Sequence, residues 1–399
     1  MLELVVVLFT GCILGCITGL TPGLHLNTIA LLALSFSPFL VKHIGIEGIL
    51  VGIVAMSITH TFVDAIPSIY LGAPDEAQVL SVLPGHRMLL KGEGHNAVKL
   101  TVIGSFLGLT LAILLVPLLI LIIKKTEPLI RDYIGYILIV VMLYMIFKDK
   151  NFLWNLALFM LSGTLGLIVL SMPNTPNVLF PLLSGLFGFS VLLVSLKSHN
   201  KIPQQYTNKK LKLNSYTLAE STLAATVVGF IASFLPGFGS SQAAVLASQF
   251  IRKIDDAGFL LLVGGINTVN MGLSLVTLYV LHKARNGSVL VLGKIIGNLS
   301  PRLFLLALIT AFIAALLAVL FSLFLSKVFS GLITRVNYRG LVMFIMAFIT
   351  LLVVIMSGYI GIIILITSTA LGLVAGLKGV AKSHLMGCLI LPVILYFVL

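Results

Sequence analysis

Two pairs of polar side chains lie in segments that are otherwise apolar and could bind a small cation. His60 and Asp64 stand four residues apart, which places both on one face of a helix. Asn267 and Asn270 stand three apart in a second apolar segment, and amide oxygens of this kind can bind Na⁺. We predict that these four residues bind H⁺ or Na⁺. The alternatives are solvation of His60 and Asp64 at a helix end, and inter-helix hydrogen bonding by the two asparagines.

Two proline-glycine breaks could bind an anion. Pro22-Gly23 and Pro236-Gly237 each interrupt an apolar run, and an unpaired backbone group in a bilayer costs several kcal/mol unless protein or water surrounds it. A helix that starts at such a break offers free N–H groups and a partial positive charge, which suit a carboxylate. Two breaks at corresponding places in two halves indicate a transporter binding site. The residues predicted to bind substrate are Thr21, Pro22, Gly23, His25, Asn27, Pro236, Gly237, Gly239, Ser240 and Ser241.

The elements that must position these residues are membrane-spanning helices. The chain has 399 residues, of which 59% are hydrophobic and only 9% charged, and its mean hydropathy is +1.18. These values predict an all-α polytopic membrane protein. Strict apolar/polar alternation is absent, which argues against a transmembrane β-barrel. The clearest apolar runs are 98–123, 152–171, 177–196, 300–326, 340–357 and 358–377, with shorter ones at 133–147 and 383–399.

The net charge of +13 comes from lysines and arginines in short loops, a pattern typical of cytoplasmic loops in a plasma-membrane protein. We therefore predict no nucleic-acid partner. The three cysteines, Cys12, Cys16 and Cys388, form no metal-ligand cluster, and we predict no metal, no cofactor and no disulfide. The N-terminus lacks a basic n-region and a cleavage site, which predicts a retained first helix.

The most polar stretch, 197–216, carries five lysines and no acid, which predicts a cytoplasmic linker between two membrane repeats, 1–196 and 217–399. Several short motifs recur in order, most at an offset of 205 or 206, and one of them pairs Asp64 with Asn270. We predict inverted repeats with discontinuous or re-entrant helices at the breaks. One observation opposes inversion: the corresponding loops 124–131 and 327–339 are both basic.

The polar, glycine-rich stretch 59–99 resembles a motif of the large membrane subunit of tripartite tricarboxylate transporters, the TctA-type permeases. It reads Ala65-Ile66-Pro67-Ser68-Ile69 and later Pro84-Gly85-His86-Arg87-Met88, followed by Lys91-Gly92-Glu93-Gly94. The family's first helix, rich in proline and glycine, also resembles residues 15–28 and 229–244. The chain departs from the family pattern at Gly72, His25 and Asn27, and its length resembles the compact archaeal-type branch.

The resemblance implies a permease for a carboxylate, with a small membrane subunit and a soluble substrate-binding protein as partners. We predict a secondary active transporter of a small organic anion, coupled to H⁺ or Na⁺. The main alternative is a translocase of polyprenyl-phosphate lipids, because a helix N-terminus binds phosphate as readily as carboxylate. An intramembrane enzyme is disfavoured, since the sequence has no H-E-x-x-H motif, no nucleophile elbow and no paired acids at helical spacing.

Overall fold

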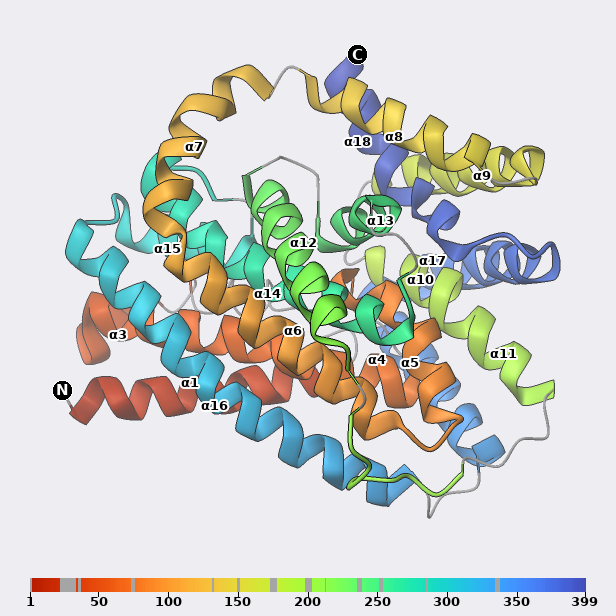
Figure 1. Ribbon diagram of the computed structural model, residues 1–399, viewed down its shortest axis with the longest axis horizontal. Helices are drawn as coiled ribbons and strands as arrows, with labels where there is room; N and C mark the ends of the chain where they lie inside the picture. Colours follow the sequence, from red (N-terminus) through yellow and green to blue (C-terminus); the bar gives the residue numbers. More distant parts are fainter. Residues whose placement is uncertain are drawn as a thin grey trace.

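The fold is that of a computed structural model, and all of its described secondary structure is helical. It describes residues 2–21, 34, 37–72, 76–130, 133–148, 151–172, 178–197, 203–211, 213–234, 239–250, 254–284, 286–333 and 338–399. Figure 1 shows the helices as a single bundle with the N-terminus at one side and the C-terminus at the top. The predicted all-helical class is therefore confirmed for this part of the chain.

The first half of the chain contains long helices separated by short helical pieces. Its elements are α1 (Leu2–Leu20), α3 (Ser37–Val63), α4 (Ala65–Leu71), η1 (Glu76–Ser81), α5 (Val82–Leu89), α6 (Gly94–Leu114), α7 (Val116–Ile130), α8 (Ile134–Lys148), α9 (Phe152–Leu170), α10 (Leu179–Leu183), the π-helical η3 (Ser184–Phe189) and α11 (Ser190–Lys197).

The second half begins after the linker. Its elements are α12 (Ser215–Phe234), α13 (Ser240–Phe250), α14 (Asp256–Leu281), α15 (Gly287–Ile296), α16 (Pro301–Ile333), α17 (Tyr338–Leu377), the 3-10 segment η4 (Lys382–Met386) and α18 (Gly387–Val398). A left-handed residue, Gly358 (φ 64°), breaks α17 at the point where the predicted runs 340–357 and 358–377 meet.

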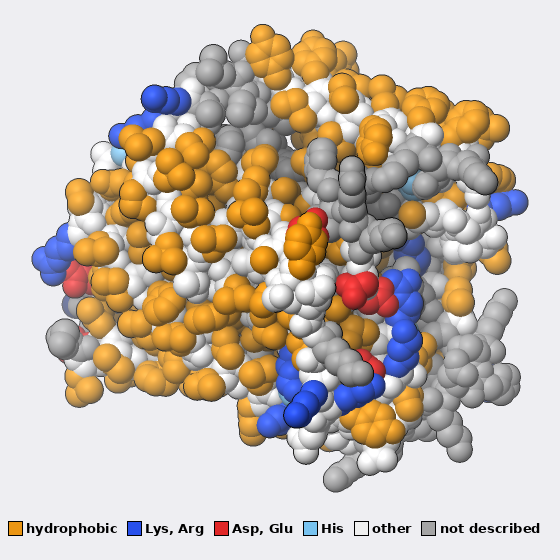
Figure 2. All heavy atoms as spheres, viewed as in Figure 1, with side chains coloured by type: hydrophobic (Ala, Val, Ile, Leu, Met, Phe, Trp, Pro, Cys, Tyr) orange, Lys and Arg blue, Asp and Glu red, His pale blue; other side chains and the backbone are white. Residues whose placement is uncertain are grey.

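In the described part of the chain, eight helices are long and apolar enough to cross a membrane. The helix that runs from Ser37 to Leu71 and helix α14 are almost wholly buried, whereas α1, α9, α16 and α17 expose most of their apolar surface. Hydrophobic side chains cover most of the face in Figure 2, while lysines and arginines gather along one lower edge. A surface of this kind is suited to lipid, and the chain is a multi-pass membrane protein.

Glycines bring α1 against α3 along its length. A Cβ at Gly11 would lie 2.6 Å from the carbonyl oxygen of Gly52, and one at Gly15 would lie 2.5 Å from that of Met56. Backbone approach this close requires glycine and is typical of helix pairs in membranes. The contacts advance along both helices in the same order, so α1 and α3 run parallel.

Helices α12 and α14 pack in the same way in the second half. A Cβ at Gly258 would meet Thr217, and one at Gly265 would meet Ala225. These contacts also advance in the same order along both helices, so α12 and α14 run parallel.

Helices α6 and α16 run in opposite directions. His95 near the start of α6 hydrogen-bonds Ser326 near the end of α16, with 2.9 Å between Nδ1 and Oγ. Further along, the rings of Phe106 and Phe312 lie 6.2 Å apart. Helix α16 runs parallel to the span formed by α3 and α4, because Arg302 pairs with Glu47 near the start of α3 and Tyr70 near the end of α4 contacts Ser326.

The buried side chains divide into a large core and two smaller ones. The large core joins α1, α3–α7 and α14–α16. A second core joins α8–α10, α13, α18 and parts of α12, α14 and α17, and a third lies between α11 and α17. Helices α12 and α14 contribute to both larger cores, so they connect the two parts of the molecule.

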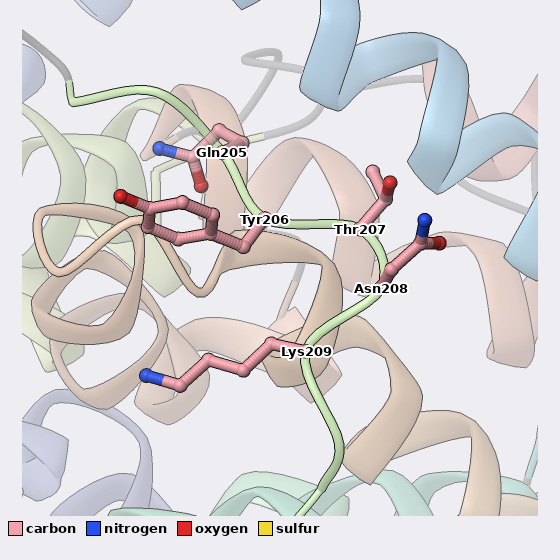
Figure 3. A pocket seen from close by; sticks show the side chains of 5 residues that line it. All are labelled: Gln205, Tyr206, Thr207, Asn208 and Lys209. Atoms are coloured by element: carbon pink, nitrogen blue, oxygen red, sulfur yellow. The ribbon is translucent and has the colours of Figure 1, made fainter.

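The linker is attached to the turn between α5 and α6. Gln205 accepts a hydrogen bond from the Gly94 amide at 3.0 Å and donates to the Leu89 carbonyl at 3.0 Å. Lys209 pairs with Glu93. Residues 205–209 line an open hollow of about 690 Å³, in which Tyr206 and Lys209 point to one side and Thr207 and Asn208 to the other (Figure 3). The linker thus marks one end of the bundle, opposite the Arg302–Glu47 pair.

Candidate functional site

The centre of the site is the carboxylate of Asp64, whose residue is 2% exposed. Asp64 lies between α3 and α4, where the helical ladder is interrupted. Pro67 accounts for the interruption, because proline has no N–H to donate and its ring clashes with the carbonyl four residues earlier. Gly72, in the left-handed region at φ 63°, ends α4, and the chain turns back so that η1 approaches Asp64.

Two amide side chains donate to the two oxygens of this carboxylate. Gln78 Nε2 lies 3.1 Å from Asp64 Oδ1, and Asn267 Nδ2 lies 2.7 Å from Asp64 Oδ2. Gln78 belongs to η1 and Asn267 to α14, so the carboxylate joins elements from both halves of the chain. Gln78 Oε1 is buried and has no hydrogen-bond partner among the described residues. A buried acceptor without a partner costs free energy unless a further donor or a cation occupies it.

Hydroxyl groups extend the polar cluster along α3 and α14. The Oγ1 atoms of Thr61 and Thr268 lie 3.0 Å apart where the two helices cross. His60 Nδ1 lies 3.0 Å from Thr18 Oγ1, close to the end of α1. The polar cluster therefore reaches the residues that immediately precede the first proline-glycine break.

Polar side chains also contact the residues beside the second proline-glycine break. Asn270 Nδ2 donates to Ser240 Oγ at 3.0 Å, and Ser240 is the first residue of α13. Gly239 begins the hydrogen-bonded turn, since its carbonyl accepts from the Ala243 amide at 3.0 Å. Ser241 is also buried. Polar residues of the cluster thus lie just before the first predicted anion-binding segment and just after the second.

The predicted site residues fall into three groups. His60, Asp64, Asn267 and Ser240 are buried and Asn270 is half-buried; Asp64 is bonded to Asn267 and Asn270 to Ser240, with Gly239 and Ser241 beside Ser240. Thr21 lies at the end of α1, where its hydroxyl donates to the Ile17 carbonyl at 2.8 Å. The remaining predicted residues lie outside the described part of the chain: Pro22, Gly23, His25, Asn27, Pro236 and Gly237.

Sequence reasoning missed Gln78, Thr18, Thr61 and Thr268. Gln78 lies within the polar stretch 59–99, so its residue type was a usable signal. The threonines gave none, because threonine is common in apolar helices, where its hydroxyl can bond the backbone of the preceding turn. Thr61 also does this, donating to the Ile58 carbonyl at 2.8 Å.

The arrangement is chemically suited to hold a small cation. Carboxylate and amide oxygens are the ligands that hard cations prefer, and the buried Gln78 Oε1 adds a free acceptor beside Asp64. A carboxylate in this position could equally accept a proton. In the described residues, no group of three or more His, Cys, Asp or Glu side chains could hold a metal ion.

Comparison with known proteins identifies the family of the chain. The chain is 32% identical over 399 residues to MJ1079, an uncharacterized protein of Methanocaldococcus jannaschii, and the alignment covers 98% of each chain. No solved structure matches the chain. Residues 5–387 match the tripartite tricarboxylate transporter TctA family. The chain therefore belongs to this family of non-enzymatic membrane transporters.

Proposed function

We propose that the chain is a secondary active permease for a small organic anion, a carboxylate, coupled to H⁺ or Na⁺. The observation that carries the proposal is the buried Asp64 carboxylate, which receives amide donors from both halves of the chain. An ionisable group in a membrane protein's interior marks an ion pathway or a coupling site. Membership of a tricarboxylate transporter family supports a carboxylate as the substrate class.

The two halves are proposed to be inverted repeats related by an offset of about 206 residues. Helices α6 and α7, residues 94–130, then correspond to α16, residues 301–333, and Asp64 corresponds to Asn270. The directions of the helices support this, because α6 and α16 run in opposite directions. The parallel pair α1–α3 likewise corresponds to the parallel pair α12–α14.

The substrate is proposed to bind between the segments that contain the two breaks. Helix α13 starts directly after the second break, and its first amides and the Ser240 hydroxyl suit an anionic oxygen. Thr18 and His60 lie at the end of α1, just before the first break. The cation site at Asp64 lies between these positions, so substrate and cation would be bound close together.

The coupling is proposed to depend on the charge of Asp64. Its two amide donors stabilise the ionised carboxylate, and Gln78 Oε1 offers an oxygen to a cation beside it. A bound H⁺ or Na⁺ neutralises the carboxylate and offsets part of the charge of the substrate. Moving one charge through 100 mV costs about 2.3 kcal/mol, so this compensation favours anion uptake.

A small membrane subunit and a soluble substrate-binding protein are proposed as partners, because the family belongs to tripartite systems. Polyprenyl phosphate is the competing substrate class, and a ligand screen separates it from the carboxylates.

Purified protein in detergent is heated with citrate, succinate, an amino acid or a short polyprenyl phosphate, with and without Na⁺ and at several pH values. A ligand at 100 times its dissociation constant stabilises a protein by about 2.7 kcal/mol. We expect citrate or succinate to raise the melting temperature, and the rise to depend on Na⁺ or pH. Stabilisation by the lipid phosphate alone would contradict the proposed substrate class.

A further inference from the structure

One lysine side chain turns inward near the C-terminal end of the chain. Lys382 begins η4, and its Nζ donates a hydrogen bond of 2.7 Å to Ser190 Oγ. Ser190 Oγ in turn donates to the Leu186 carbonyl in η3 at 2.6 Å. Lys382 is half-buried, whereas Lys378, four residues earlier, is exposed and lies 4.4 Å from the centre of the Trp154 ring. The sequence alone does not distinguish the two lysines, because both lie in the short loop between two apolar runs.

The charge of Lys382 has no compensating partner among the residues that the structure describes. Within the part of the chain that the structure describes, no carboxylate lies within ion-pair distance of its Nζ. Burial lowers the pKa of Lys382 from 10.5 to about 8. A cation taken out of water is costly unless an opposite charge accompanies it. Among the described residues, the half-buried ammonium therefore has a neutral hydroxyl as its hydrogen-bond partner and no carboxylate.

Lys382 lies on η4, which packs close to the polar cluster, and Ser190 is the first residue of α11, directly after η3. The segment η4 contacts α13, whose first residue, Ser240, is bonded to Asn270. The π-helical η3 contacts η1, which carries Gln78. Helical irregularities of this kind are frequent at functional sites. Thus η1 contacts η3 directly, and α13 contacts both η1 and η4.

Few other titratable groups belong to the elements that pack against η4. On the described side chains of η4, α9, α13, α17 and α18 they are His384, Cys388, Arg339, Tyr359 and Tyr396, and Lys378 follows α17 directly. None of these is an acid, so the local charge is positive or neutral.

We propose that Lys382 is a substrate-binding residue whose ammonium group binds an anionic oxygen of the transported molecule. This inference rests on the proposed function and deepens it. The ammonium has three donors, of which Ser190 takes one, and the others are available to a carboxylate or a phosphate ester. Ser190 fixes the side chain, and α13 supplies neutral donors from the opposite side.

The test measures anion binding by calorimetry with purified full-length protein. The probes are citrate, inorganic phosphate and a short polyprenyl phosphate, each at pH 7 and pH 9. The variants are Lys382→Gln, which removes the charge, and Lys382→Arg, which keeps it at all accessible pH values. Lys378→Gln is the matched control, because it removes an exposed lysine from the same loop.

We expect Lys382→Gln to weaken binding of the anion about tenfold to a hundredfold, the range for a hydrogen bond to a charged group. Lys382→Arg and Lys378→Gln should bind within a few-fold of wild type. Wild-type affinity should fall between pH 7 and pH 9, because the free lysine loses its proton as the pH rises through about 8. The affinity of Lys382→Arg should stay constant over the same range.

Two results would overturn the inference, and they are distinguishable. If wild type binds citrate or the lipid phosphate and Lys382→Gln binds it equally well, Lys382 does not bind substrate but the proposed function stands. If wild type binds none of the anions, both proposals fail. The pH dependence of wild type decides the matter if Lys382→Gln does not fold, because a pH-independent affinity contradicts a role for this lysine. Binding of citrate would identify the ligand as a free carboxylate, and binding of the polyprenyl phosphate would identify it as a lipid headgroup.

Discussion

At the scale of single residues, the Asp64 carboxylate is held by donors that lie far apart in the sequence. Gln78 follows it by 14 residues and Asn267 by 203. The sequence predicted Asp64 and Asn267 as polar residues in apolar segments, because their cost of insertion implies a function. It could not predict that they touch, since that contact depends on how α3 crosses α14.

The hydrogen bond from Asn267 should support both the site and the fold. Asn267→Ala removes one of two donors to a buried carboxylate, which costs about 1–3 kcal/mol, and more for charged groups. We expect a lower melting temperature in detergent and a loss of the stabilisation that Na⁺ or low pH gives to wild type. The measurement is a thermal melt with and without Na⁺ across pH.

Asn155→Ala provides the control for this prediction. Asn155 is also buried, but it donates to the Ile146 carbonyl at a longer distance of 3.4 Å, in the other core. It should lower the melting temperature less and leave the cation effect intact. If Asn267→Ala retained the full cation effect, Asn267 would have no part in the cation site.

At the scale of helices, the apolar runs predicted several spans but missed those at 37–71, 215–233 and 256–281. The runs 152–171 and 300–326 correspond to α9 and α16, and 98–123 corresponds to α6 with part of α7. The short pieces α5, η1 and η4 could not be predicted from hydropathy, because each is shorter than a span. Their positions depend on Pro67, Gly72 and the packing of neighbouring helices.

The antiparallel arrangement of α6 and α16 is consistent with the proposed inversion of the two halves. The end of α16, with Lys327, lies beside the start of α6, where the linker is attached. The end of α7, with Lys125, follows the opposite end of α6. The two basic loops, which correspond in sequence, therefore lie at opposite ends of the bundle. Charge alone could not show this, because both loops are basic.

Cysteine labelling tests this arrangement of the helices. Lys125→Cys and Lys327→Cys are made in a background without Cys12, Cys16 and Cys388, and both positions are exposed. A membrane-impermeant maleimide should label Lys125→Cys on intact cells. It should label Lys327→Cys only after permeabilisation, because that residue lies at the end of the bundle that carries the linker, which we predict to be cytoplasmic.

Lys209→Cys in the linker is the reference for the cytoplasmic side. Equal labelling of Lys125→Cys and Lys327→Cys on intact cells would mean that the loops share one side. The two halves would then be parallel repeats, or no repeats at all.

At the scale of the whole molecule, the two larger cores meet along α12 and α14, and α14 carries Asn267 and Asn270. Composition predicted a polytopic membrane protein, and the motif at 59–99 predicted its family. The arrangement of the cores was not predictable, because it depends on glycines whose neighbours are more than 150 residues away, such as Gly104 against Leu261. Transport by such a molecule requires the cores to move relative to each other around the site.

Uptake into proteoliposomes tests the central claim most directly. Wild-type protein is reconstituted, and labelled citrate or succinate is added outside with an inward gradient of Na⁺ or H⁺. We predict that one gradient drives accumulation, and that Asp64→Asn folds but abolishes the dependence on that gradient, because the amide cannot take up a proton and lacks the negative charge that attracts Na⁺. Gradient-driven uptake by Asp64→Asn at the wild-type rate, or no uptake of any carboxylate by wild type, would contradict the account.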